Sequence, residues 1–261
     1  MADSFYFLCF SKLKNIITFL FHSMRNKHSM SRVWIEFFIL ATFFLAAHPL
    51  LAHEQIIVSG GPALRFHEKY KANTHDRHWG NFVDAAMLRV AEIKTTIPQN
   101  DTITWMVYKP AYETRSKEEK EDLINIIIQK ANTSNVHLVW FSNRQELLDY
   151  LNADRSTNHK IARLEYFGHS NKRTLMFDYS NDLDGASAEP SMLHILNLNR
   201  IRRDDFTATP YCKSWGCHSG EQFSSAWYKA TGRRMYGAIG KTDYAKGGLP
   251  VLSTSQGRWS E

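Results

Sequence analysis

Residues 161–170 read IARLEYFGHS, a run of apolar and aromatic side chains that ends at a glycine and a histidine. A run of this kind, closed by glycine, is typical of a β-strand that stops at residue 167. Comparable runs elsewhere in the chain are 55–58, 103–108, 136–141, 209–216 and 235–239. The sequence therefore predicts six strands.

Helical periodicity separates these strands. Apolar side chains recur every three or four residues in the segments 82–93, 123–131, 147–151 and 223–230. Capping boxes are predicted before the last three of these segments, at Ser116 with Glu119, Ser142 with Gln145, and Ser219 with Gln222. Gly232 is predicted to end the fourth. Strands alternating with helices predict an α/β fold, with a mostly parallel central sheet and helices on both faces. The polar stretch 171–190 reads as a loop or β-hairpin.

Residues 1–52 read as a leader. Three basic residues between 25 and 32 precede an apolar run, 37–47, which is followed by His-Pro-Leu-Leu and the small residue Ala52. This order is typical of a secretory signal at 30–52, for which Met30 is an alternative start. The apolar run rises only about 16 Å as a helix, too short for a bilayer core of roughly 30 Å. We expect a secreted or periplasmic protein. An uncleaved membrane anchor is the alternative, and the only expected contact with a membrane.

Residues 53–261 are long enough for one domain with a sizeable core. The formal net charge of the chain is +6, but residues 1–52 hold five basic and two acidic residues, which leaves +3 for the domain. No block of Lys and Arg with interleaved aromatic residues occurs, so we expect no nucleic-acid partner. No set of Cys and His residues has a recognisable zinc spacing, so we expect no metal and no cofactor.

Two cysteines remain in this domain, Cys212 and Cys217. If residues 211–217 are extended, five steps of about 3.3 Å separate the two Cα atoms by roughly 16 Å. A disulfide needs them within about 7 Å. We therefore expect two free thiols, Cys212 in the core and Cys217 available for chemistry.

Reactive residues follow two of the predicted strands. His169 follows the strand 161–167, and Cys217 follows the strand 209–216. Functional groups of parallel sheets gather beyond the carboxyl ends of the strands, so the two residues emerge at the same edge if their strands are neighbours. Cys217 lies two residues before Ser219, the predicted N-cap. The helix N-terminus and a nearby imidazole would both favour its thiolate form.

Gly168-His169 after one strand, and Cys217-His218-Ser219-Gly220 after another, resemble the metacaspases and the wider caspase-like cysteine peptidases. Metacaspases carry Ser-Gly-His-Gly at the histidine and Asp-Ser-Cys-His-Ser-Gly at the cysteine. Here the histidine lies 48 residues before the cysteine, against about 50 in the caspase family. Residues 59–78 look loosely like legumain, another peptidase of this group.

This resemblance covers about residues 55–245. It implies a caspase-like three-layer αβα fold and a cysteine endopeptidase that hydrolyses proteins or peptides through a thioacyl-enzyme. By implication His169 is the general acid/base, Cys217 is the nucleophile, and the N–H groups of Ser170 and Cys217 form the oxyanion hole.

The chain departs from the metacaspase pattern at two positions. Ser170 replaces the glycine after the histidine. Trp215 replaces the aspartate that selects Arg or Lys, so basic specificity is not implied. The family position of residues 240–244 would place Thr242 and Asp243 in the substrate cleft beside Trp215, with Asp243 as an alternative acidic wall. Trp215 fits a place in the core equally well.

Two other functions stay open. A catalytically inactive caspase-like binding or scaffold protein would keep the fold and the altered specificity position. Gly168-His169-Ser170 also resembles part of the nucleophile elbow of serine hydrolases, with Ser170 as nucleophile, although Lys172 stands where that motif needs its second glycine. We expect His218 to be a structural neighbour of the site and not a second base.

Overall fold

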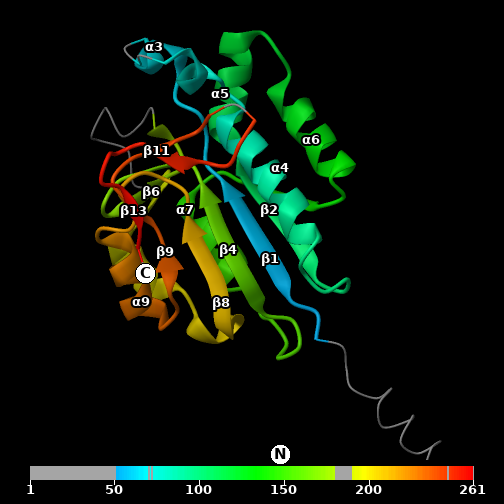
Figure 1. Ribbon diagram of the computed structural model, residues 1–261. Helices are drawn as coiled ribbons and strands as arrows, with labels where there is room; N and C mark the ends of the chain where they lie inside the picture. Colours follow the sequence, from blue (N-terminus) through cyan, green and yellow to red (C-terminus); the bar gives the residue numbers. More distant parts are fainter. Residues whose placement is uncertain (1–50, 70, 72, 180–189, 246, 261) are drawn as a thin grey trace, which may run out of the picture. The chain divides into compact units, whose positions relative to one another are not determined.

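Six parallel strands form the central sheet of this computed structural model, in the order β3-β2-β1-β4-β8-β9 (Figure 1). They are β1 (Glu54–Ser59), β2 (Thr102–Tyr108), β3 (His137–Phe141), β4 (Ile161–Phe167), β8 (Phe206–Ser214) and β9 (Met235–Tyr236). Every pairing within this sheet is parallel. The predicted α/β fold is confirmed, and the sheet is all-parallel where the sequence predicted a mostly parallel one.

The structure describes residues 51–69, 71, 73–179, 190–245 and 247–260. Residues 51–261 form one compact unit. The predicted signal at 30–52 falls almost wholly outside the described residues, so it stays a prediction. Within the described part, no helix has the length and apolar character needed to cross a membrane.

Six α-helices belong to the described part. They are α3 (Arg65–Glu68), α4 (Asn81–Lys94), α5 (Lys109–Glu119), α6 (Leu123–Thr133), α7 (Arg144–Leu151) and α9 (Phe223–Thr231). Successive side chains of a strand point to opposite faces of the sheet. Accordingly, Ile56 and Val58 of β1 pack in one apolar cluster with α7 and α9, while Ile57 packs in the other with α4 and α6. The apolar helix faces therefore cover both faces of the sheet.

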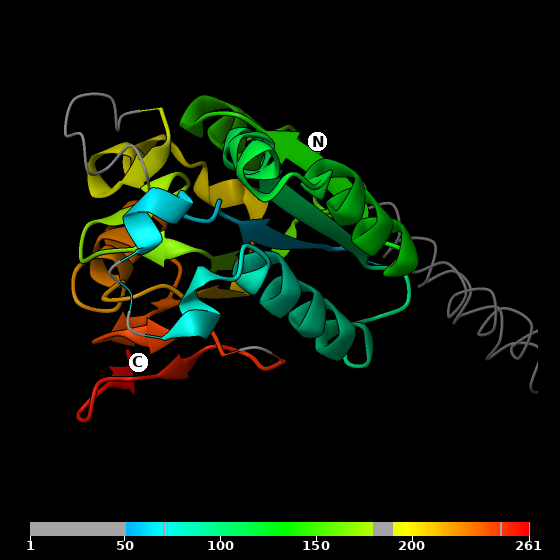
Figure 2. The ribbon, with the colours of Figure 1, turned by 90° about the horizontal axis from the view of Figure 1, so that it is seen from above.

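The direction in which the chain builds the sheet reverses once. From β1 the chain runs outward through β2 to β3, then returns to β4 on the other side of β1 and continues to β8 and β9. The carboxyl ends of β1 and β4 thus flank a topological switch point, where open α/β sheets bind their ligands. Figure 2 looks from above at this end of the sheet, where α3, the segment after β4 and the C-terminal segments gather.

Three smaller sheets lie outside the central one. β5 (His169–Ser170), β6 (Thr174–Met176) and β7 (Met192–His194) form an antiparallel sheet. Of the two alternatives predicted for 171–190, a loop or a β-hairpin, the described residues support the hairpin; residues 180–189 lie outside the described part. The predicted strand 235–239 is divided between β9 and β10 (Ala238–Ile239), which pairs with β13 (Arg258–Trp259). β11 (Thr242–Asp243) pairs with β12 (Val251–Leu252).

All three predicted capping boxes are wrong. The N-cap of α7 is Asn143 and not Ser142, and its side-chain oxygen accepts the N–H of Glu146 at 3.0 Å. Ser116 lies inside α5, and α6 is capped by Asp122, whose carboxylate accepts the N–H of Asn125 at 3.0 Å. α9 begins at Phe223, and its N-cap is Gln222 without a side-chain bond, although Gly232 ends it as predicted. Ser219 lies instead in the turn between Cys217 and α9, where its hydroxyl donates to the carbonyl of Gly216 at 3.1 Å.

Candidate active site

A cavity of about 370 Å³ lies at the carboxyl ends of β1, β4 and β8. Its walls come from the segments after these three strands, from the entry to α4, and from Lys241, Thr242 and Tyr244. His169, Ser170, Cys217 and Thr242, all predicted as site residues, line it together. Because β4 and β8 are adjacent, residues 48 positions apart in the sequence share one cavity, as predicted from the strand ends.

The segments that carry His169 and Cys217 are in direct contact. The hydroxyl of Ser170 donates to the backbone carbonyl of Cys217 at 2.6 Å. Gly216 makes this approach possible, because a Cβ at that position would lie 2.2 Å from the Ser170 hydroxyl oxygen and 2.7 Å from the carbonyl oxygen of Gly168. A side chain at residue 216 would therefore push the two segments apart.

Aromatic rings surround His169. The ring of Phe82 meets it edge to face at a centroid distance of 4.8 Å, and the ring of Tyr179 stacks on it at 4.4 Å. Neither ring nitrogen of His169 has a hydrogen-bond partner within the described residues. Burial, and to a lesser degree the positive charge of Lys71, lowers the pKa of His169 to about 3. The imidazole is therefore neutral near pH 7, and one of its two ring nitrogens carries no proton.

Three groups of Thr242 lie beside the sulfur of Cys217. Its N–H points to Sγ at 3.3 Å, and its carbonyl and hydroxyl oxygens both lie 3.6 Å from Sγ. The hydroxyl of Thr242 also donates to the carbonyl of Trp215 at 2.9 Å, which fixes the residue beside the thiol. The expectation that a helix N-terminus lies at Cys217 is wrong, because α9 starts six residues later, at Phe223. Backbone and side-chain groups of Thr242 take the place beside the sulfur that the sequence assigned to a helix end.

Two backbone N–H groups are available beside the thiol. That of Cys217 has no acceptor in the described part of the chain. The N–H of Asn171 donates to the carbonyl of Thr174 across the hairpin at 3.0 Å. N–H groups of successive residues in an antiparallel strand alternate between facing the partner strand and facing away. The N–H of Ser170 therefore faces away from β6. Among the described residues, neither N–H group predicted for the oxyanion hole donates a hydrogen bond, so both could donate to an oxyanion.

His218 also lines the cavity, and it is held by charged groups. Its Nδ1 lies 2.5 Å from a carboxylate oxygen of Glu221, and the other oxygen of Glu221 pairs with Lys172 at 2.9 Å. Hydrogen bonding to Lys172 and to His218 lowers the pKa of Glu221 to about 2. His218 has a φ of 60°, in the left-handed region that few residues other than glycine adopt. The sequence indicated neither this carboxylate partner nor the strained backbone.

Trp215 lies in the core and does not line the cavity. It stacks on Phe167, and its indole N–H donates to the buried carboxylate of Glu165 at 2.8 Å. Of its two readings from sequence, the structure favours the core position. Asp243 is also not among the residues that line the cavity, since its carboxylate bonds to Nε2 of His75 at 2.8 Å. Cys212 is a buried free thiol in the core, as predicted, and Cys217 is free as well.

Three further cavity residues were missed from sequence. They are Phe82 and Tyr179, whose rings contact His169, and Tyr244, whose ring packs on Phe82. The hydroxyl oxygen of Tyr244 accepts a hydrogen bond from the N–H of Gly168 at 3.2 Å. Phe82 was assigned only to the apolar face of its helix, and an aromatic residue in a loop carries no local signal of a partner elsewhere. Finding these residues required the tertiary structure.

No family model matches the chain, and neither a curated protein nor a solved structure is found to be similar to it. Function is therefore inferred from the residues of this cavity and from their geometry.

Proposed function

We propose that the protein is a caspase-like cysteine endopeptidase, with Cys217 as nucleophile and His169 as general acid and base. One observation carries the proposal. An imidazole and a free thiol line the same cavity, at the carboxyl ends of adjacent parallel strands, on segments joined by the bond from Ser170 to Cys217. The metacaspase-like motifs Gly168-His169 and Cys217-His218-Ser219-Gly220 lie in these two segments.

In the proposed reaction the thiol of Cys217 gives its proton to the neutral imidazole of His169. The sulfur then bonds to the carbonyl carbon of the scissile peptide, and the oxyanion accepts hydrogen bonds from the backbone N–H groups of Ser170 and Cys217. The protonated His169 delivers its proton to the leaving amine as the carbon–nitrogen bond breaks, which leaves a thioester. His169 next takes a proton from water, which attacks the thioester. The carboxylic acid leaves, and the thiol regains its proton.

The charges beside the cavity bear on the substrate. Glu68 pairs with the buried Arg115 at 3.0 Å, and Asp76 and Asp243 both face His75, at 3.3 and 2.8 Å. These carboxylates already have cationic or hydrogen-bonding partners, and the specificity aspartate of metacaspases is replaced by Trp215. We therefore expect no strong preference for Arg or Lys at the cleavage position. A substrate cation without a partner there would lose several kcal/mol.

The serine-hydrolase alternative is disfavoured. The hydroxyl of Ser170 is donated to the carbonyl of Cys217, and Ser170 lies in the hairpin strand β5 and not in a strand-to-helix turn. A nucleophile elbow requires such a turn and an exposed hydroxyl. An inactive scaffold stays the rival that experiment must exclude. Export through the predicted signal at 30–52 is part of the proposal.

Covalent labelling tests the proposal most directly. Peptides that carry an electrophilic ketone after Ala, Asp or Arg should modify one residue, Cys217, as identified by peptide mass analysis. Labelling should disappear in Cys217→Ala and persist in the matched control Cys212→Ala, which removes the buried free thiol. The Arg peptide should react no faster than the Ala peptide. Folded protein whose Cys217 resists every probe would favour a scaffold over an enzyme.

A further inference from the structure

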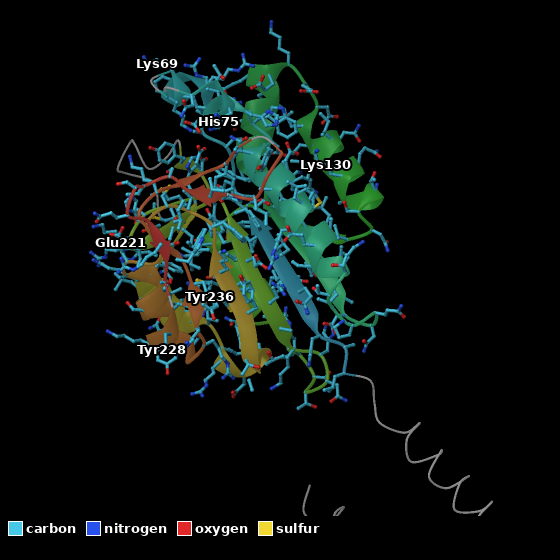
Figure 3. The ribbon with its side chains drawn as sticks, in the orientation of Figure 1. Lys69, His75, Lys130, Glu221, Tyr228 and Tyr236 are labelled. Atoms are coloured by element: carbon cyan, nitrogen blue, oxygen red, sulfur yellow. The ribbon has the colours of Figure 1, made fainter. Side chains whose placement is uncertain are left out.

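Three metal-ligating side chains converge beside the cavity, outside the proposed catalytic pair. His75 and Asp76 lie in a 3-10 helix (Thr74–Arg77), and Asp243 lies in β11, 168 residues away from His75 in the sequence. Nε2 of His75 lies 2.8 Å from an oxygen of Asp243 and 3.3 Å from an oxygen of Asp76. The three ligand atoms all lie within 4.8 Å of one another. His75 is labelled at the upper end of the molecule in Figure 3, where Figure 1 shows β11.

We propose that His75, Asp76 and Asp243 bind a divalent transition-metal ion that accepts mixed nitrogen and oxygen ligands, for which Zn²⁺ is the probe. Zinc–ligand bonds are about 2.0–2.2 Å, which places neighbouring ligand atoms of a tetrahedral site about 3.4 Å apart. The separation of 3.3 Å between His75 and Asp76 already has this value, and the hydrogen bond between His75 and Asp243 needs to open by only some tenths of an ångström. About one third of each side chain is exposed, so water can occupy the fourth position.

A neighbouring cluster shows what an ordinary ion pair looks like in this protein. Nε2 of His78 lies 3.0 Å from Asp84, whose other oxygen pairs with Nζ of Lys130 at 2.9 Å. Its side chains are about as exposed as those of the first cluster. The difference is the third member: His78 and Asp84 are joined by a lysine, whereas His75 and Asp243 are joined by a second carboxylate. The cluster around His75 therefore has a third group that can ligate a metal ion, the carboxylate of Asp76. At the same place the cluster around His78 has the ammonium of Lys130.

One nearby positive charge opposes a bound ion. Nζ of Lys71 lies 3.4 Å from the backbone carbonyl of Asp76, and this contact is to the main chain and not to the carboxylate. The ammonium can keep this contact while the carboxylate of Asp76 ligates the ion, because the two contacts use different atoms of the residue.

An ion at this site would act on the residue beside the thiol. Asp243 directly follows Thr242, whose N–H and carbonyl contact the sulfur of Cys217 at 3.3 and 3.6 Å. Asp76 and Thr242 line the same cavity. The ion would hold the segment of Asp76 and the segment of Thr242 together, and so fix one wall of the cavity against Cys217. The site itself does not depend on the proposed peptidase activity.

Zinc titration of a protein without the reactive thiol tests the site. In a Cys217→Ala background, calorimetry should give one Zn²⁺ per chain, and zinc should raise the melting temperature because the ion binds the folded protein. His75→Gln and Asp243→Asn should each weaken zinc binding by tenfold or more, since one of three protein ligands is lost. His78→Gln, the matched control from the ordinary ion pair, should bind zinc as tightly as its parent.

Asp76→Asn is included because His75→Gln or Asp243→Asn could fail to fold. It keeps the hydrogen bond between His75 and Asp243 and removes only the charge of the third ligand, so it should fold normally and still bind zinc more weakly. The site does not exist if the Cys217→Ala protein binds no zinc. The assignment is equally wrong if folded His75→Gln and Asp76→Asn bind zinc as their parent does.

Discussion

The two histidines of the cavity have opposite surroundings. His169 lies among the rings of Phe82 and Tyr179, has no carboxylate partner among the described residues, and is kept neutral by burial. His218 is tied by Nδ1 to Glu221, which also pairs with Lys172 (Figure 3 labels Glu221). A histidine oriented by a carboxylate is the usual form of a catalytic base. By hydrogen bonding alone, His218 would be chosen as the base.

The difference shows that hydrogen bonding and chemical role need not coincide. His218 is bound through Nδ1 to Glu221 and through its N–H to the carbonyl of Gly240 at 2.7 Å. These bonds join the turn after Cys217 to the segment before Thr242, which suits a structural task. Within the part of the chain that the structure describes, His169 makes no such bond, so we propose that its nitrogens exchange protons with a thiol and a substrate. We therefore assign proton transfer to His169 and support of the site to His218.

Substituting each of the two histidines separately should produce the largest difference in kcat/KM. His169→Ala should lower kcat/KM by about 10²–10⁴, the usual contribution of general acid–base catalysis. Cys217→Ala and the double variant should fall to a similar residual rate, because residues that act as a unit lose activity non-additively. His218→Asn, which tolerates the left-handed backbone, should keep kcat/KM within about tenfold. Peptidase rates and melting temperatures of all four variants decide the assignment.

The roles would be reversed if His218→Asn were as inactive as Cys217→Ala while folded His169→Ala kept its activity. Cys217→Ser should retain little activity, because a hydroxyl gives up its proton far less readily than a thiol. Cys212→Ala should retain most activity, since that thiol contributes only to packing.

Acid should reveal the desolvation of the half-buried His169. Its pKa is about 3 in the folded protein and about 6.5 in an unfolded chain. Between these values the unfolded chain binds a proton that the folded protein does not. The free energy of unfolding should therefore fall as the pH drops from 6.5 toward 3, by up to about 1.4 kcal/mol per pH unit from this group. Above pH 6.5 the group contributes no pH dependence.

Urea unfolding at pH 7, 5.5 and 4.5 measures this slope. His169→Asn should lose less stability than the wild type on acidification, whereas the exposed His137→Asn should behave as the wild type does. Parallel slopes for the wild type and His169→Asn would mean that His169 is protonated in the folded protein, and the aromatic surroundings would then not keep it neutral.

Glu221→Gln should produce the smallest effect. It keeps the shape of the side chain and removes the charge that pairs with Lys172 and His218. Because these groups are partly exposed, the loss of stability should be about 1 kcal/mol and the change in kcat/KM less than about tenfold. Glu113→Gln, at the exposed pair with Lys109 on α5, is the matched control and should change neither quantity. A loss of activity as large as that of His169→Ala would place the His218–Glu221 pair in catalysis.

Sequence patterns located the central strands well and the helix starts poorly. The apolar runs 103–108 and 161–167 became β2 and β4 almost residue for residue, because buried strands need such runs. α5 was missed because residues 109–119 are mostly charged, and only Ala111, Tyr112 and Arg115 of this helix are buried. The serines read as caps were wrong, since a serine followed by Glu or Gln also occurs inside helices and turns.

The sequence by itself determined the α/β class, the strand ends at which His169 and Cys217 stand, and the free thiols, because each depends on local composition and spacing. Only the tertiary structure decided which groups meet there. The partners of His169, Glu221 and Asp243 are Phe82, Lys172 and His75, which lie far from them in the chain. Strand order brings such groups together, and no local pattern records it. The same long-range packing moved Trp215 into the core and left Thr242 beside the thiol.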